Sequence, residues 1–389
     1  MRLPNGNPLN IGNPSWQSVL ADHVEAHGGG AHRDRQLNEI TAFGSNPGQL
    51  RMWTYIPPGL PAGSPLVVVL HGCGQNAAGY TNSAGWNELA GRYGFGVLAP
   101  EQTPQNNPNG CFNWFQPDDI TRGRGEAASI KQMIDTMLAL HGFDDRRVFV
   151  TGLSAGGAMT SAMLATYPET FAGGAIIAGL PYGAASNLSE ALRAMHRPAA
   201  RSPREWGDIV RHASPHSGSW PKISIWHGDA DFTVAAANAE ASIEQWADVL
   251  GVAGAVAREE TTPLYRHRVW LDTKGDAVLE AYTIRGMGHG TPILIGTSPD
   301  ACGTPAPFIL PAGISSSART AEFFGLRARV APLGQSAPEA SPPGAASQTF
   351  PWVRSPEPAG APPLLSEASR GSRVGRVITG ALRAAGLLK

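Results

Sequence analysis

The sequence has few cysteines, no long apolar run and almost no net charge. Three cysteines in 389 residues exclude a scaffold built on disulfides, and their spacing matches no zinc-binding pattern. The apolar runs are far shorter than the ~20 residues of a membrane-spanning helix. The formal net charge of −1 gives no electrostatic sign of binding to nucleic acid or to an anionic membrane.

The first residues show no signal-peptide pattern. The segment MRLPNGNPLNIGNPSWQ contains neither a basic start nor an apolar core, so a cytoplasmic location stays open on the sequence alone. Residues 1–45 are polar and rich in glycine, with three consecutive glycines at 28–30. We expect a loose N-terminal arm there, followed by a catalytic domain over residues 46–326.

Strand-like and helix-like segments alternate between residues 50 and 326. Short apolar runs are typical of parallel strands that are buried on both faces. The alternation therefore predicts an α/β fold, a mostly parallel sheet with helices on both faces. The expected strands are 50–56, 66–70, 94–99, 148–151, 175–178, 222–226 and 279–284, and the clearest expected helices are 125–141, 158–167 and 236–250.

The composition changes after this region. Residues 327–372 are rich in Pro, Ala, Ser and Gly, which predicts a disordered linker. In residues 373–389, apolar side chains recur at steps of three and four, with arginines opposite, a spacing compatible with a short amphipathic helix. Such a helix would suit contact with a polymer granule or a membrane surface, and a terminus that touches nothing is the alternative.

Ser154 is the candidate nucleophile. It is the serine of a G-x-S-x-G pattern that follows an apolar strand-like run and leads into a helix-like segment. The chain has 47 glycines, so the pattern alone has little weight. Its place between a strand and a helix is that of a nucleophile elbow, the tight turn that exposes a catalytic serine.

A serine nucleophile needs a base and a carboxylate that orients the base. His289 lies between glycines just after the strand at 279–284, and it is the expected base. Asp231 lies in H-G-x-x-D-x-x-V after the strand at 222–226, and it is the expected acid, with Asp229 of the same loop as the alternative. The order Ser, Asp, His is that of α/β hydrolases. We expect His71 and His227 to support loops.

Attack by a serine nucleophile on a carbonyl group also requires two backbone N–H groups that face the developing oxyanion. Ala155, the residue after the nucleophile, should supply one, because it lies at the start of a helix. The loop after the strand at 66–70 should supply the other, and we expect the donor to be the amide of Cys73.

Several motifs together resemble the PHB-depolymerase-type esterases, the catalytic domains of short-chain polyhydroxyalkanoate depolymerases, which are related to feruloyl and acetylxylan esterases. They include LHGCGQNAAGY, GWNELAGRYGFGVLAPEQ, NPNGCFNWF, TGLSAGGAM and HGDADFTV. The resemblance covers residues 40–326. It implies an α/β-hydrolase fold, ester hydrolysis through an acyl-enzyme, no metal or cofactor, and often secretion. Ser154, Asp231 and His289 match its triad.

The resemblance also bears on the residues around the site. In the family, a cysteine pair placed like Cys73 and Cys111 can form a disulfide, and two buried thiols are the alternative. Trp114 is expected either to line the substrate pocket or to pack in the core. Arg122, Arg124 and Glu126 are expected to fix a loop.

The sequence therefore predicts a serine esterase that acts on poly- or oligo(3-hydroxybutyrate) or on other short-acyl esters. A feruloyl or acetylxylan esterase acting on plant cell wall is the first alternative. The second alternative is a protein that binds polymer granules or membranes through its C-terminal tail.

Overall fold

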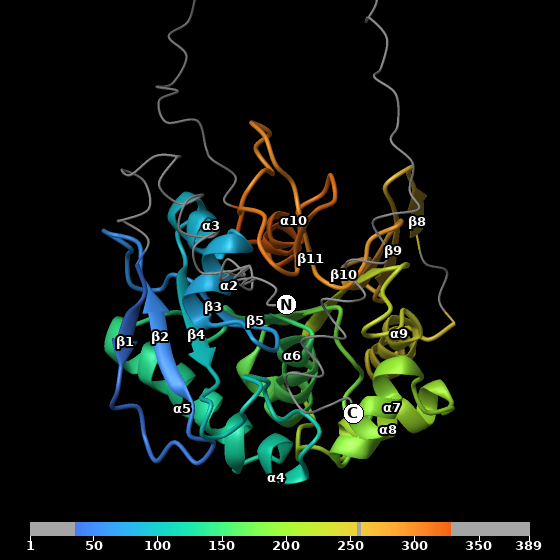
Figure 1. The fold of residues 1–389 in the computed structure, drawn as a ribbon, viewed down its shortest axis with the longest axis horizontal. Coiled ribbons are helices and arrows are strands. Elements are labelled where there is room, and N and C mark those ends of the chain that lie inside the picture. Colours follow the sequence, from blue (N-terminus) through green and yellow to red (C-terminus); the bar gives the residue numbers. More distant parts are fainter. Residues whose placement is uncertain (1–35, 255–257, 328–389) are drawn as a thin grey trace, which may run out of the picture. The chain divides into compact units, whose positions relative to one another are not determined.

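The centre of the molecule is a ten-stranded sheet with the strand order β1-β2-β4-β3-β5-β6-β7-β10-β9-β8 (Figure 1). The computed structural model describes residues 36–254 and 258–327. The strands of the sheet are β1 (Asn38–Ile40), β2 (Arg51–Tyr55), β3 (Leu66–Leu70), β4 (Gly96–Glu101), β5 (Val148–Leu153), β6 (Gly173–Ile177), β7 (Lys222–Gly228), β8 (Arg258–Thr261), β9 (Tyr265–Leu271) and β10 (Ala277–Ile284). Two short strands, β11 (Thr291–Ile293) and β12 (Ile309–Pro311), pair separately.

The middle of the sheet is parallel. Strands β4, β3, β5, β6, β7 and β10 run in the same direction. The antiparallel strands lie at the two sides, with β2 and β1 beyond β4 and with β9 and β8 beyond β10. The expected mostly parallel sheet is confirmed.

The central strands are apolar throughout because both faces of the sheet are covered. In β3, Leu66, Val68 and Leu70 belong to one apolar cluster, and Val67 and Val69 belong to the other. Successive side chains of a strand point to opposite faces, so each face of β3 lies against its own layer of helices.

The helices form two layers. In Figure 1, α2, α3 and α10 lie above the sheet and α4 to α9 lie below or beside it. The first group packs in one apolar cluster and the second group in the other. The helices are α2 (Ala77–Ser83), α3 (Trp86–Tyr93), α4 (Pro117–Ile120), α5 (Gly125–His141), α6 (Ala155–Thr166), α7 (Leu188–His196), α8 (Pro203–Arg211), α9 (Ala237–Val249) and α10 (Ser316–Phe323), with a 3-10 turn at Pro168–Thr170.

Local sequence explains where several helices begin and end. The side chain of Asn76 accepts a hydrogen bond from the Gly79 amide at the start of α2. Ser202 and Glu205 form a capping box at the start of α8. Helices α3 and α5 end at Gly94 and Gly142, both with a left-handed backbone that glycine adopts at little cost.

The sheet begins before the expected start of the catalytic domain at residue 46. Strand β1 pairs with β2, and Leu37 and Phe43 are buried. Residues 36–326 belong to one compact unit. The greater part of the expected arm, the linker at 327–372 and the helix at 373–389 lie outside the described residues, apart from Arg327.

Within the described residues, no helix combines the length and the apolar character that crossing a bilayer requires.

Candidate active site

Ser154 lies on a tight turn between β5 and α6. Its backbone has φ 57° and ψ −115°, a conformation that is strained for a residue with a side chain. The Ser154 amide donates to the carbonyl of Ile177, 2.9 Å away. A Cβ atom on Gly152 would collide with the Gly156 carbonyl, and a Cβ on Gly156 would collide with the Leu70 carbonyl. The two glycines of the G-x-S-x-G pattern are therefore required by close backbone contacts.

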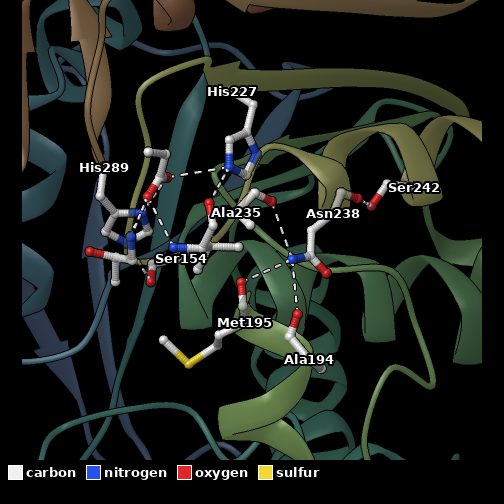
Figure 2. Close-up of polar contacts among 11 residues, drawn as sticks. Ser154, Ala194, Met195, His227, Ala235, Asn238, Ser242 and His289 are labelled. Carbon is white, nitrogen blue, oxygen red and sulfur yellow. Dashed lines mark hydrogen bonds and ion pairs between the residues drawn. The ribbon is translucent and has the colours of Figure 1, made fainter. Parts of the chain in front are cut away.

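His289 joins the serine to a carboxylate. Its Nε2 atom lies 2.9 Å from Oγ of Ser154, and its Nδ1 atom lies 2.7 Å from Oδ2 of Asp231 (Figure 2). An ionised carboxylate only accepts hydrogen bonds, so Nδ1 carries the proton. The lone pair of Nε2 then faces the hydroxyl of Ser154, which is the arrangement of a base beside a nucleophile.

Asp231 is held from both sides. Its Oδ1 atom accepts hydrogen bonds from the amides of Thr233 and Val234, each at 2.9 Å. Its Oδ2 atom faces His289 and also lies 3.3 Å from Nε2 of His227. Burial alone would raise the pKa of Asp231, but the hydrogen bonds from His227 and His289 outweigh burial and hold this pKa well below its usual range. The carboxylate is therefore ionised across the neutral range.

The structure places Asp229, the alternative acid, away from the histidine. Its Oδ1 atom accepts a hydrogen bond from the amide of Gly286 at 2.6 Å, and its side chain is exposed. Asp229 thus connects the loop after β7, residues 229–234, which we call the acid loop, to the loop that carries His289. The carboxylate beside His289 belongs to Asp231.

His227 supports the acid loop, as expected from the sequence, but it also reaches the acid itself. Its Nε2 atom lies 2.8 Å from the carbonyl oxygen of Val234, which accepts hydrogen bonds only. The proton of His227 must therefore be on Nε2, and it points towards both Val234 and Asp231. The carboxylate of Asp231 lies between two imidazoles.

Sequence reasoning did not find Asn238. This fully buried side chain in α9 donates from Nδ2 to the carbonyls of Ala194, Met195 and Ala235 (Figure 2). It connects the end of α7 to the segment that follows Asp231. No sequence signal marks an asparagine in the first turns of a helix as such a link, because its partners are backbone atoms of other segments.

The two amides expected to bind the oxyanion come from neighbouring segments. A Cβ atom on Gly156 would meet the carbonyls of Leu70 and His71, so the start of α6 lies against the loop that contains Cys73. Among residues 36–254 and 258–327, the amides of Ala155 and Cys73 donate to no protein acceptor. Their role in catalysis stays a prediction.

Of the three cysteines, Cys73 and Cys111 are joined by a disulfide, and Cys302 is a buried free thiol. Trp114 is 8% exposed and packs edge-on against Phe115 in an apolar cluster. A role of Trp114 in substrate binding stays a prediction.

The charged loop residues have different roles. Arg122 pairs with Glu169 and donates to the carbonyl of Thr166, whereas Arg124 pairs with Asp118 at the surface. Glu126 is fully buried. No group of His, Cys, Asp or Glu side chains in the described part of the chain is suited to hold a metal ion.

A mostly parallel sheet of this strand order, with a serine on the turn after β5 and a histidine and an aspartate at the ends of later strands, defines an α/β hydrolase. The comparisons with known proteins agree. The family described as Esterase PHB depolymerase matches residues 50–263.

Individual relatives are esterases and depolymerases. The chain is 47% identical over 291 residues to poly(3-hydroxyalkanoate) depolymerase C of Paucimonas lemoignei, which covers 75% of this chain and 70% of that protein. It is 30% identical to feruloyl esterase B of Talaromyces stipitatus over 66% of this chain and 72% of that protein. Among solved structures, an acetyl xylan esterase from Aspergillus awamori superimposes with a TM-score of 0.62 and 28% identity, over 75% of this chain and 99% of that chain.

The chain belongs to the PHB depolymerase esterase family. It is a hydrolase of carboxylic esters.

Proposed function

We propose that this protein hydrolyses ester bonds of poly- or oligo(3-hydroxybutyrate) through Ser154, His289 and Asp231. The main support for this mechanism is the continuous hydrogen-bonded path from Oγ of Ser154 through His289 to Asp231. The substrate class rests on the higher identity to a polyhydroxyalkanoate depolymerase, 47%, than to a feruloyl esterase, 30%.

In the first half of the reaction, Oγ of Ser154 attacks the carbonyl carbon of the ester while Nε2 of His289 takes the hydroxyl proton. The carbonyl oxygen becomes an oxyanion, which the amides of Ala155 and Cys73 stabilise. The carbon–oxygen bond of the ester then breaks. His289 gives its proton to the departing alkoxide, and a 3-hydroxyacyl ester of Ser154 is left.

In the second half, a water molecule takes the place of the departed alcohol. His289 removes a proton from the water, and the resulting hydroxide adds to the acyl carbon. The bond to Ser154 breaks, His289 returns its proton to Oγ, and a 3-hydroxy acid is released. Asp231 keeps its negative charge throughout and stabilises the imidazolium that forms in each half.

One exposed side chain, next to Asp231 in the chain, supports a polymeric ester. Phe232 follows Asp231 directly and is 89% exposed. Apolar surface removed from water contributes roughly 25 cal/mol per Å², so Phe232 can add affinity for a polyester surface. Phe232→Ser should slow hydrolysis of PHB particles and leave hydrolysis of p-nitrophenyl butyrate unchanged. Leu140→Ser, at another exposed apolar side chain in α5, is the control.

The test of the reaction and of the substrate uses one panel: 3-hydroxybutyrate oligomers, methyl ferulate, acetylated xylan and p-nitrophenyl butyrate. Ser154→Ala should abolish turnover of every ester that the wild type hydrolyses. Ser161→Ala is the control, because Ser161 lies in α6 and donates to the Leu180 carbonyl instead of contacting His289. A higher kcat/KM on methyl ferulate or acetylated xylan than on the oligomers would favour the first alternative, a feruloyl or acetylxylan esterase.

We also propose that the protein works outside the cytoplasm. The disulfide between Cys73 and Cys111 supports this, because disulfides persist in oxidising compartments. Thiol titration of the denatured, unreduced protein from its native host should find one thiol, that of Cys302. Three thiols would contradict the proposal.

The second alternative, binding of a granule or membrane by residues 373–389, concerns residues outside the described structure. Deletion of residues 328–389 followed by a granule-binding assay tests it.

A further inference from the structure

Glu126 is a buried carboxyl group that the reaction above does not use. It lies in the first turn of α5 and is fully buried. Its Oε1 atom accepts hydrogen bonds from Nε2 of Gln102 at 2.5 Å and from Nδ2 of Asn106 at 3.0 Å, and its Oε2 atom accepts one from the amide of Asn113 at 2.8 Å. Three donors from one loop region therefore converge on this carboxyl.

Gln102 links Glu126 to the loop that contains Cys73. Its Nε2 group uses both hydrogens, one on Glu126 and one on the carbonyl of Cys111 at 2.9 Å. The backbone N–H of Gln102 donates to Nε2 of His71 at 3.1 Å. Since Nε2 of His71 accepts, the proton of His71 is on Nδ1, which donates to the Gly72 carbonyl at 2.8 Å.

These contacts form a closed path that starts and ends at Gln102. It runs to Cys111, across the disulfide to Cys73, along the backbone to His71, and back to Gln102. Glu126 holds the side chain of Gln102 in this path. Residues 70–75, which we call the oxyanion loop, are thus held at His71 and at Cys73. A further hydrogen bond, from the amide of Gly74 to the carbonyl of Asn109 at 3.0 Å, joins the same two segments.

We propose that Glu126 is a positioning residue of the esterase reaction, which acts through Gln102 and the disulfide to place the Cys73 amide for the oxyanion. This inference rests on the proposed function, because it takes the Cys73 amide as an oxyanion donor. Such a donor works only within hydrogen-bond reach of the oxyanion, and loss of one donor typically lowers kcat by ~10²–10³. A displaced loop would weaken the donor without removing it.

The choice of a carboxyl at this position has a chemical reason. Both of its oxygens accept hydrogen bonds, whereas an amide accepts on one side only. In Glu126→Gln, the NH₂ group must face either the Asn113 amide or the pair Gln102 and Asn106, and two donors then meet. The loop must shift to separate them. Glu126→Gln is therefore a small change in volume that releases one side of the network.

The experiment compares Glu126→Gln with Glu280→Gln. Glu280 is also buried and accepts a hydrogen bond from Ser224 at 2.7 Å, but it lies on β10 and has no contact with the oxyanion loop. For each variant we would measure kcat and KM with p-nitrophenyl butyrate. We would also measure inhibition by an alkyl trifluoromethyl ketone, which Ser154 converts into an oxyanion adduct that resembles the transition state.

The expected result for Glu126→Gln is a fall in kcat of about tenfold or more and a similar loss of affinity for the trifluoromethyl ketone, with KM within about threefold of wild type. Glu280→Gln should leave all three values near wild type. If Glu126→Gln fails to fold, Gln102→Met replaces it, since methionine removes the bonds to Glu126 and Cys111 and keeps the backbone bond to His71. The same pattern is expected.

Unchanged affinity for the ketone in a folded Glu126→Gln or Gln102→Met variant would overturn the proposal, and so would equal losses in Glu280→Gln. Failure of the proposed function has a different signature. In that case the ketone would not inhibit the wild type, or Ser154→Ala would remain active.

Discussion

Asp231→Asn tests how Asp231 orients His289, the proposed base. The amides of Thr233 and Val234 both donate to Oδ1 of Asp231, so the oxygen of an asparagine would stay on that side to accept them. Its NH₂ group would then face Nδ1 of His289, which lies 2.7 Å from the present Oδ2. His289 could meet this donor only with a lone pair on Nδ1, and its proton would move to Nε2. A protonated Nε2 cannot take the proton of Ser154.

The expected loss is large because the base is present but in the wrong tautomer. The corresponding change in serine proteases lowers kcat by ~10⁴, which corresponds to about 5 kcal/mol of transition-state free energy. The introduced NH₂ group also faces the N–H of His227, 3.3 Å from Oδ2, so the acid loop loses a second contact. We therefore expect a fall in kcat of at least ~10³ with a smaller change in KM.

The assay is steady-state hydrolysis of p-nitrophenyl butyrate, with circular dichroism to show that the variant is folded. Asp229→Asn is the matched control. Its side chain accepts from the Gly286 amide through one oxygen, and an asparagine can keep that bond. A folded Asp231→Asn with a kcat within tenfold of wild type would refute the reasoning, and so would a loss in Asp229→Asn as large as that in Asp231→Asn.

Two further predictions concern stability. The lowered pKa of Asp231 contributes stability above 3.8 that is lost as pH falls towards the folded value, so acid unfolding of Asp231→Asn should show less of this loss. Reduction of the disulfide, whose cysteines are 38 residues apart, should lower the free energy of unfolding by up to about 4 kcal/mol on the chain-entropy account, and a midpoint in urea unmoved by reductant would contradict this.

The triad candidates could be found in the sequence because the fold class limits where they can be. Each follows a run that the pattern predicts as a parallel strand, and the ends of neighbouring parallel strands meet at one edge of the sheet. Ser154 and His289 are adjacent in space although 135 residues separate them. The two glycines of the turn around Ser154 can also be recognised in the sequence. Close backbone contacts leave no room for a side chain at Gly152 or Gly156, so only glycine fits there.

The edges of the sheet were harder to predict. Strand β8 is exposed along its whole length, and β9 is mostly half-buried. Neither is an apolar run, so the pattern that marks central strands does not mark them. Strand β1 has three residues, of which two are exposed, and its place in the sheet depends on pairing with β2.

Residue type and order along the chain were enough to predict the fold class and to select Ser154, His289 and the loop that carries Asp231 as triad candidates. The folded chain was needed to show that Asp231, and not Asp229, lies beside His289, that His227 contacts Asp231, and that Gln102 joins Glu126 to residues 70–75. These relations depend on hydrogen bonds a few ångströms long between segments that are distant in the chain. Many of the partners are backbone groups, which every residue carries and which no sequence pattern distinguishes.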